Sequence, residues 1–222
     1  RAQVETRGAG PDVILIPGLA STSAVWARTA SALEGRYRLH LVTVRGFGDV
    51  APAGNVEGLI GGPAATEIRR YIAEKGLERP AVIGHSMGGA SLLMAAQRAP
   101  QLFRALFVFE PIVFPPVDES VERPPNPLAG GARKRRSTFD SYEDALANYA
   151  SKPPMSAFHP DAREQYVRHG FKKTAHGVEL KCLPEHEAVT YETGGTSGAW
   201  EQLGNIKTKT WVISGALAPF QP

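Results

Sequence analysis

The chain has 222 residues, of which 42% are hydrophobic and 21% charged, an ordinary composition for a globular protein. This length is enough for one domain with a sizeable core, with or without an inserted cap. The net charge is only +3, which gives no electrostatic argument for a nucleic-acid partner. No apolar stretch is long enough to cross a bilayer, so we expect no membrane span.

The sequence gives little indication of a cofactor or of the cellular compartment. Cys182 is the only cysteine, so an internal disulfide is impossible and the redox compartment stays open. The chain begins at Arg1 without an apolar signal core, which leaves the cytoplasm as the default and export after removal of a signal as the alternative. No His, Cys and carboxylate cluster has metal-ligand spacing, and no dinucleotide or phosphate-loop motif occurs, so we expect no metal and no cofactor.

The first half of the chain alternates apolar runs of strand length with helical patterns. We expect a helix with one apolar face after Pro63, and an almost uncharged helix from Gly89 to Ala99, ended by Pro100. The alternation favours an α/β fold with a mostly parallel sheet and right-handed crossovers. We expect strands at 13–17, 38–44, 79–83 and 105–110, and another at 209–214. The run at 13–17 is the first expected core strand.

The segment Gly84-His85-Ser86-Met87-Gly88 joins the third of these strands to the uncharged helix. A G-x-S-x-G between a strand and a helix is typical of a nucleophilic serine held on a strained turn, where the glycines avoid collisions of Cβ atoms. The helix that follows points its N-terminal amides at negative charge that develops beside the hydroxyl. Ser86 is therefore the candidate nucleophile.

From about Pro11 to Gly215, this arrangement resembles the α/β-hydrolase superfamily. Members of that superfamily cut ester, amide, epoxide or carbon–carbon bonds with a nucleophile, a histidine and an acid. The resemblance implies an α/β-hydrolase fold: a mostly parallel sheet, flanking helices and a helical cap insertion. The motif identifies the superfamily well and the substrate hardly at all.

The resemblance also implies an oxyanion hole formed by backbone N–H groups. One donor is expected from Leu19, in the loop after the first strand, and the other from Met87. The superfamily's usual His-Gly in that loop is Pro17-Gly18 here, so the glycine remains. We expect Gly18 and His85 to lie beside the substrate.

The pattern changes between residues 112 and 204. Prolines break regular structure, the basic run Arg133-Lys134-Arg135-Arg136 is interpreted as a solvated loop that begins at Gly130-Gly131, and three helical patterns follow. In the resembling superfamily such an insertion is a cap that covers the mouth of the active site and excludes water. The expected organisation is a first part of the hydrolase core, a mainly helical cap, and a last core strand with a tail, over 1–111, 112–204 and 205–222.

Several large apolar residues of the expected cap are candidates for lining a substrate pocket. We place Met155 and Phe158 in the substrate-binding set, and Tyr166, Phe171 and Trp200 are further candidates. Aromatic residues of a small cap more commonly form its own core.

A serine nucleophile needs a base to take its proton and an acid to orient that base. In the resembling superfamily the acid commonly follows the strand that matches 209–214, and the histidine follows one further strand. Here the turn after 209–214 has no carboxylate and no histidine follows His186, so we expect a truncated C-terminal end without an identifiable base. The remaining histidines do not suggest one: His85 is expected to be packed, and the histidines within the cap to be solvated.

Glu110 ends the strand after the nucleophile helix and is the tentative triad acid, because catalytic groups gather at the carboxyl ends of strands. The alternative is a carboxylate that caps backbone amides near the hinge of the cap. Asp49 is a lower choice for the acid.

These features favour a serine hydrolase that acts on a carboxylic ester of a small or medium apolar substrate, through an acyl-enzyme on Ser86. An alternative is a catalytically impaired scaffold that binds an apolar ester or acid without turnover. Carbon–carbon or carbon–halide chemistry is a weaker hypothesis, because haloalkane cleavage normally uses an aspartate where Ser86 stands. The strand at 209–214 is expected at an exposed sheet edge, which allows oligomerisation.

Overall fold

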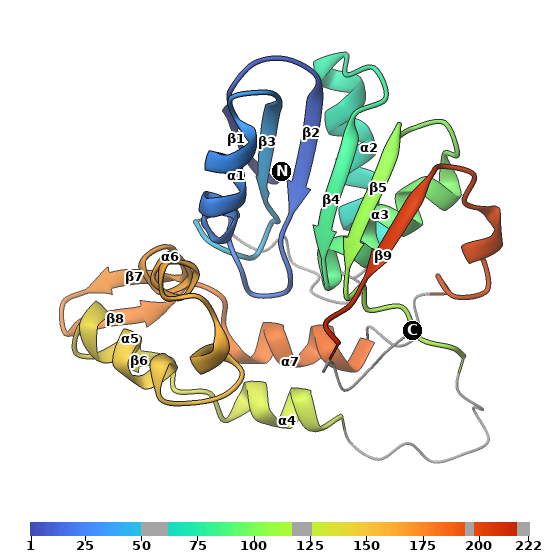
Figure 1. Ribbon diagram of the computed structural model, residues 1–222. Coiled ribbons are helices and arrows are strands. Elements are labelled where there is room, and N and C mark those ends of the chain that lie inside the picture. Colours follow the sequence, from blue (N-terminus) through green and yellow to red (C-terminus); the bar gives the residue numbers. More distant parts are fainter. Residues whose placement is uncertain (50–61, 117–125, 194–197, 217–222) are drawn as a thin grey trace.

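The computed structural model describes residues 1–49, 62–116, 126–193 and 198–216, so the expected tail from 217 lies outside the described residues. A six-stranded sheet with flanking helices forms one half of the molecule (Figure 1). Its strand order is β1-β3-β2-β4-β5-β9, and every neighbouring pair is parallel except β1 with β3. The predicted α/β-hydrolase architecture is therefore confirmed. The strands that match the five apolar runs are β2 (Asp12–Ile16), β3 (Arg38–Thr43), β4 (Ala81–His85), β5 (Ala105–Phe109) and β9 (Thr210–Ile213).

The sequence analysis did not predict β1 (Gln3–Arg7), an edge strand that precedes β2, the first buried strand. β1 pairs antiparallel with β3 at the edge of the sheet. Its residues are exposed or only half-buried, and four of the five, all except Val4, are polar or charged. An edge strand of this composition lacks the continuous apolar run that marks the buried parallel strands.

The apolar residues of β2 serve both faces of the sheet. Val13 and Leu15 pack with Ala30 on one face, whereas Ile14 and Ile16 belong to the larger core on the other. This division explains why the strand is apolar throughout. The helices of this half are the 3-10 turn η1 (Ser23–Trp26), α1 (Ala27–Leu33), α2 (Gly62–Lys75) and α3 (Met87–Arg98).

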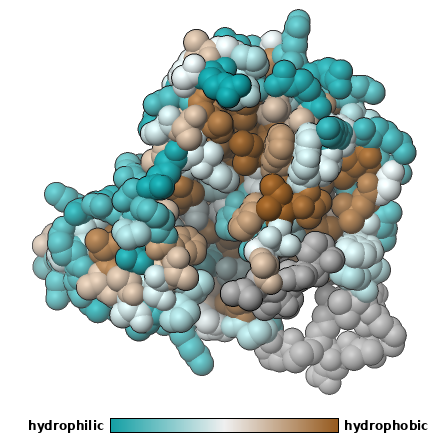
Figure 2. All heavy atoms as spheres, in the orientation of Figure 1, coloured by the Kyte–Doolittle hydropathy of each residue, from teal (hydrophilic) through white to brown (hydrophobic). Residues whose placement is uncertain are grey.

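β9 forms the second edge of the sheet and presents apolar side chains to solvent. Trp211, Val212 and Ile213 are exposed, and the indole of Trp211 stacks on the ring of Phe107 with centroids 4.4 Å apart. Apolar residues are visible on the front of the sheet half in Figure 2. Association of copies through this edge stays a prediction.

The other half of the molecule lies beyond the carboxyl ends of the parallel strands (Figure 1). It contains a three-stranded antiparallel sheet, in the order β6-β8-β7, which the sequence reading of a mainly helical insertion missed. Its members in chain order are α4 (Pro127–Arg133), β6 (Thr138–Phe139), α5 (Tyr142–Ala150), η2 (Met155–Ala157), α6 (Pro160–Gly170), β7 (Phe171–Thr174), β8 (Gly177–Leu180) and α7 (Pro184–Thr193); η4 (Leu203–Asn205) leads back to β9.

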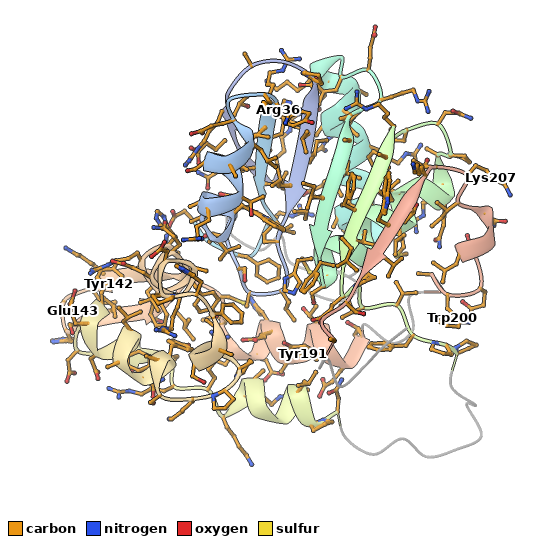
Figure 3. The ribbon with its side chains drawn as sticks, in the orientation of Figure 1. Arg36, Tyr142, Glu143, Tyr191, Trp200 and Lys207 are labelled. Atoms are coloured by element: carbon orange, nitrogen blue, oxygen red, sulfur yellow. The ribbon has the colours of Figure 1, made fainter. Side chains whose placement is uncertain are left out.

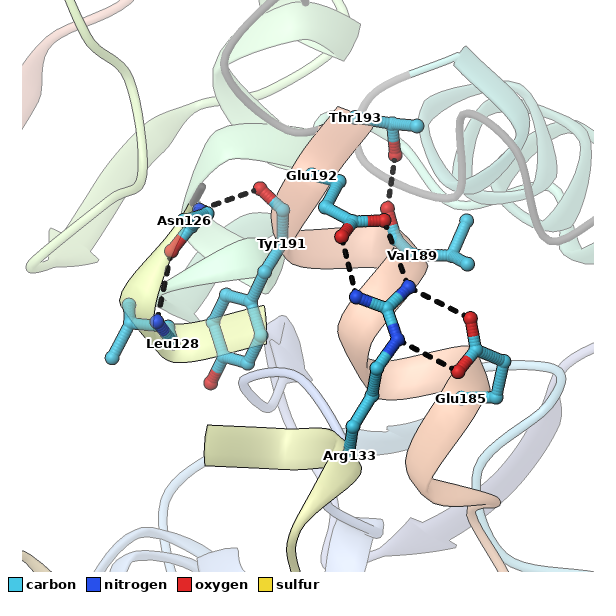
Figure 4. A network of polar contacts seen from close by, with 8 residues as sticks. All are labelled: Asn126, Leu128, Arg133, Glu185, Val189, Tyr191, Glu192 and Thr193. Atoms are coloured by element: carbon cyan, nitrogen blue, oxygen red, sulfur yellow. Dashed lines mark hydrogen bonds and ion pairs between the residues drawn. The ribbon is translucent and has the colours of Figure 1, made fainter. Parts of the chain in front are cut away.

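The helix α4 replaces the basic loop expected from Gly130-Gly131. Pro127 starts the helix, and the side chain of Asn126 accepts a hydrogen bond of 2.9 Å from the backbone N–H of Leu128. Arg133, at its end, bonds both Glu185 and Glu192 of α7 (Figure 4). Capping and contacts with α7 therefore outweigh the low helix propensity of the two glycines.

A polar network joins β2, β3 and α2 at the amino-terminal side of the sheet. The carboxylate of Asp12 accepts hydrogen bonds of 2.5 and 2.8 Å from the guanidinium of Arg38, and His40 Nε2 lies 2.8 Å from Asp12 Oδ1. The other ring nitrogen of His40 lies 2.8 Å from the hydroxyl of Tyr71. These contacts lower the pKa of Asp12 to about 2, and the hydrogen bonds from Arg38 have the largest effect.

Asp12→Asn is expected to lower the free energy of unfolding at pH 7 by about 1 kcal/mol, since partly exposed ion pairs are screened. The folded-state pKa lies below the unfolded value of about 3.9, so this stabilisation is present above about pH 4 and is lost as the pH falls towards 2. Urea unfolding of both proteins across this range should show curves that converge in acid. Equal stability of the two proteins at pH 7 would contradict the assignment.

Candidate active site

Ser86 occupies a strained turn between β4 and α3. Its φ of 52° and ψ of −116° lie in a region that residues with a Cβ atom seldom adopt. The backbone N–H of Ser86 donates to the carbonyl of Phe109 at 2.9 Å, and the Ser86 carbonyl accepts from Ala90 at 3.0 Å. The turn is thus fixed to β5 on one side and to the first turn of α3 on the other.

The glycines around Ser86 are required by close packing. A Cβ atom on Gly88 would lie 2.4 Å from the carbonyl oxygen of Ile16 and 2.6 Å from that of Pro17. A Cβ atom on Gly84 would lie 2.8 Å from the backbone of Gly89. Backbone groups cannot rotate away from such contacts as side chains do, so any larger residue would displace α3 from the sheet.

Ser86 is half-buried and opens into a cavity of about 680 Å³ between the two halves of the molecule. Gly18, Leu19 and His85 line it from the core. Met155, Phe158 and Tyr166 line it from the opposite side, as does Tyr191, which Figure 3 shows on α7. The structure therefore brings together Ser86 and all four residues of the predicted substrate-binding set, Gly18, His85, Met155 and Phe158.

Two further candidates for the lining lie elsewhere. Phe171 is buried in the small core of the second half, where its ring contacts those of Phe139 and Tyr149. Trp200 is exposed and lies beside the main sheet, away from the end of the molecule marked by Tyr142 (Figure 3).

The predicted anion donors are the backbone N–H groups of Leu19, which lines the same cavity as Ser86, and of Met87, which follows Ser86 in the chain. Met87 is the first residue of α3, and the helix's own hydrogen bonds begin with the N–H of Ala90. Within the described part of the chain, neither N–H donates to a protein acceptor. Gly18 allows the close approach of the Leu19 loop, because a Cβ atom there would lie 3.3 Å from Ser86 Cβ and 2.9 Å from His85 Nδ1.

His85 lines the cavity next to Ser86. Burial lowers the pKa of His85, and the carboxylate of Glu110 opposes that shift. The described residues provide no hydrogen bond between this ring and the Ser86 hydroxyl. His85 contacts the ring of Phe109 instead, with centroids 5.7 Å apart.

All six histidines of the sequence lie in the described residues, and the other five are away from Ser86. His40 is bound to Asp12 and Tyr71 in the sheet. His159 caps the start of α6, where its Nδ1 accepts from Asp161 N at 3.3 Å. His169, His176 and His186 are the other three, and none of the five lines the cavity. The geometry assigns no general base.

Glu110 does not line the cavity. Its Oε1 accepts a hydrogen bond of 3.1 Å from the backbone N–H of Gly215, and its own N–H donates to the carbonyl of Ile213 at 2.8 Å. This matches the alternative in which the carboxylate caps a backbone amide, and a role as triad acid stays a prediction. Asp49 is exposed and pairs with Lys181 at 2.8 Å.

A buried polar cluster at the cavity was missed in the sequence. Arg135 was interpreted as part of a solvated loop, but only 17% of its side chain is exposed. Its guanidinium donates to Glu187 and Tyr166, and its Nε donates to Tyr149 at 2.9 Å. These partners lie up to 52 residues away in the sequence, so no local pattern marks the cluster.

Among the described residues, no three His, Cys, Asp or Glu side chains form a group that would hold a metal ion. None of the helices in that part of the chain combines the length and hydrophobicity that a membrane span requires.

Comparisons with known proteins place this arrangement in context. A sequence profile described as the Alpha/beta hydrolase family matches residues 13–205. The chain is 48% identical over 54 residues to the pimeloyl-[acyl-carrier protein] methyl ester esterase of Aeromonas hydrophila, which covers 24% of this chain and 21% of that protein. It is 34% identical over 103 residues to the protein of the same name from Nitrosomonas europaea, covering 46% and 38%. The matches span less than two-fifths of the length of these curated relatives.

Solved structures show the same fold at lower identity. A peroxisomal alpha-beta-hydrolase from Saccharomyces cerevisiae superposes with a TM-score of 0.80 at 16% identity, covering 100% of this chain and 69% of that one. E-2-(Acetamidomethylene)succinate hydrolase superposes with a TM-score of 0.73 at 19% identity, covering 97% and 87%.

Gly88→Ala is expected to destabilise the protein by about 1–3 kcal/mol, because the new Cβ atom meets two backbone carbonyls. Gly130→Ala is the matched control: no atom lies within 4 Å of its Cβ position, and alanine in a helix interior should raise stability by about 0.5–1 kcal/mol. Thermal unfolding of both variants measures the difference. A Gly88→Ala protein as stable as the parent would refute the packing argument.

Proposed function

This chain belongs to the alpha/beta hydrolase family, and we propose that it hydrolyses carboxylic esters with Ser86 as the nucleophile. The observation that carries the proposal is the strained turn that presents Ser86 to a cavity of about 680 Å³. The names of the similar curated proteins, methyl ester esterases, support an ester as the substrate. No observation favours a binding scaffold without turnover.

In the proposed reaction the hydroxyl oxygen of Ser86 attacks the ester carbonyl. The oxygen of the tetrahedral intermediate would accept hydrogen bonds from the N–H groups of Leu19 and Met87, which is how an oxyanion hole stabilises developing negative charge. Loss of the alcohol leaves an acyl-enzyme, and water then releases the acid. The positive end of α3 favours the negative charge on the same oxygen.

The expected rate of ester hydrolysis is low, because none of the described histidines is bonded to the Ser86 hydroxyl. A serine hydrolase without its base keeps the catalysis of its oxyanion hole and binding site, about 10³–10⁴-fold above the reaction in water. We therefore expect slow turnover of the 222-residue chain and faster reaction with esters that have good leaving groups.

The segment 112–204 would act as the cap. Met155 and Phe158 face the cavity opposite Ser86 and would hold an apolar acyl chain. The remainder, 1–111 and 205–222, would form the hydrolase core. Glu110 would help to hold the last described turn of that core through Gly215.

Labelling with a fluorophosphonate probe tests the nucleophile. We expect the parent chain to be labelled slowly, because an oxyanion hole assists attack on phosphorus but the described residues place no base at the Ser86 hydroxyl, and we expect Ser86→Ala to remain unlabelled. Ser151→Ala, an exposed serine of α5's end, is the control and should label like the parent. Mass spectrometry locates the adduct, and an unlabelled parent chain would favour the binding scaffold instead.

A further inference from the structure

The imidazole of His85 lines the cavity beside Ser86 and has no hydrogen-bond partner. In the described part of the chain, neither ring nitrogen bonds a protein group, and the ring instead contacts that of Phe109, with centroids 5.7 Å apart. A polar group at the wall of a cavity that lacks a protein partner binds water or a ligand. The ring is therefore available to a molecule inside the cavity.

The space beside Gly18 brings one ring nitrogen of His85 close to the side chain of Ser86. A Cβ atom at Gly18 would lie 2.9 Å from His85 Nδ1 and 3.3 Å from Ser86 Cβ, so both atoms border the same point. Glycine places no side-chain atom there. Two hydrogen bonds through one water span about 5–6 Å, so a water at this point would bond Nδ1 and approach an acyl group on Ser86.

Burial favours the form of His85 that can accept a proton. It lowers the pKa of His85, and the carboxylate of Glu110, which follows β5, opposes that shift. The loop after β2 brings Gly18 to the ring, and glycine does not titrate. Across the cavity, Glu187 is the one carboxylate among the described lining residues, and Arg135 binds it. A neutral imidazole is the commonest base of enzymes that work near neutral pH.

We propose that His85 is the general base of the second half of the reaction, in which water releases the acyl group from Ser86. This role rests on the proposed ester hydrolysis at Ser86. His85 Nδ1 takes a proton from a water beside Gly18 while the oxygen of that water bonds to the acyl carbon. The bond between this carbon and Ser86 Oγ then breaks and the carboxylic acid leaves. Ser86 Oγ takes a proton from cavity water, and the imidazolium returns its proton to that water.

This role differs from that of a triad histidine, because His85 acts on the water and not on the serine hydroxyl. The described residues place no hydrogen bond between the ring and that hydroxyl. Formation of the acyl-enzyme from an ester with a good leaving group should therefore not depend on His85, whereas hydrolysis of the acyl-enzyme should. The two half-reactions give separate readouts.

Loss of an acyl group from Ser86 tests the role of His85. The chain is acylated with p-nitrophenyl butyrate, separated from the reagent by rapid gel filtration and followed by mass spectrometry. His85→Asn keeps a polar side chain without the basic nitrogen, and we expect it to lose the butyryl group about 10²-fold more slowly than the parent. The rate of fluorophosphonate labelling should be the same in both. His176→Asn is the matched control, because His176 is exposed between β7 and β8 and does not line the cavity, and it should leave both rates unchanged.

Two further measurements distinguish a base from a residue that only maintains the structure. Imidazole added to His85→Ala should accelerate loss of the butyryl group, because removal of the ring leaves space that opens into the cavity, and it should not do so in His176→Ala. In the parent, loss of the group should slow as the pH falls through the lowered pKa of His85, because the protonated ring accepts no further proton. His85→Asn should lack that dependence.

Failure of this role and failure of the hydrolysis give different results. A butyryl group that leaves the parent and His85→Asn at the same rate overturns the role of His85 and keeps Ser86 as the nucleophile. A parallel fall of labelling and acyl loss without rescue by imidazole also overturns it. A parent that neither releases p-nitrophenolate nor carries a butyryl group on Ser86 overturns the hydrolysis itself. Thermal unfolding shows whether His85→Asn stays folded, and His85→Gln takes its place if it does not.

Discussion

The backbone of Ser86 is held at a φ of 52° by the elements on both sides of it. A non-glycine residue in such a conformation costs about 1–3 kcal/mol, and it persists only where the surrounding structure imposes it. Here the hydrogen bond to Phe109 and the contact of Gly88 with the end of β2 impose it. The same contacts bring the Leu19 loop, the serine and the start of α3 together. One packing arrangement therefore positions both Ser86 and the proposed anion donors.

That arrangement leaves the cavity to be shaped by the second half of the molecule. In the proposed reaction the core would supply a hydroxyl and N–H donors, which suit any carbonyl compound. Selectivity must come from groups such as Met155, Phe158 and Arg135 on the opposite side. In this proposal, chemistry and substrate choice are carried by separate parts of the chain, as is usual for a fold that serves many reactions.

The sequence predicted the parts of the fold that depend on local patterns. Continuous apolar runs marked the parallel strands, and the G-x-S-x-G marked the turn between β4 and α3. β1 was not predicted, because its pairing with β3, and not its composition, makes it a strand. The helix α4 was not predicted, because its two glycines have low helix propensity. Asn126 and α7 stabilise this helix through contacts that the local sequence does not show.

The candidate site divides in the same way. Gly18, His85 and Ser86 follow from the motif and the loop before it, and the cavity includes all three. The Arg135 cluster depends on contacts between α5, α6 and α7, so its basic neighbours suggested only a solvated surface. Charged residues in a run are usually exposed, and burial of one of them shows only when its partners are assembled.

Arg133 ties together the first and last helices of the second half of the molecule. Its guanidinium bonds Glu185 and Glu192, so α4, where the segment leaves the core, is tied to α7, where it returns (Figure 4). The residues between them form a loop closed at its base. Changes of length or sequence between α4 and α7 would therefore reshape the side of the cavity opposite Ser86 and leave the β4–α3 turn in place.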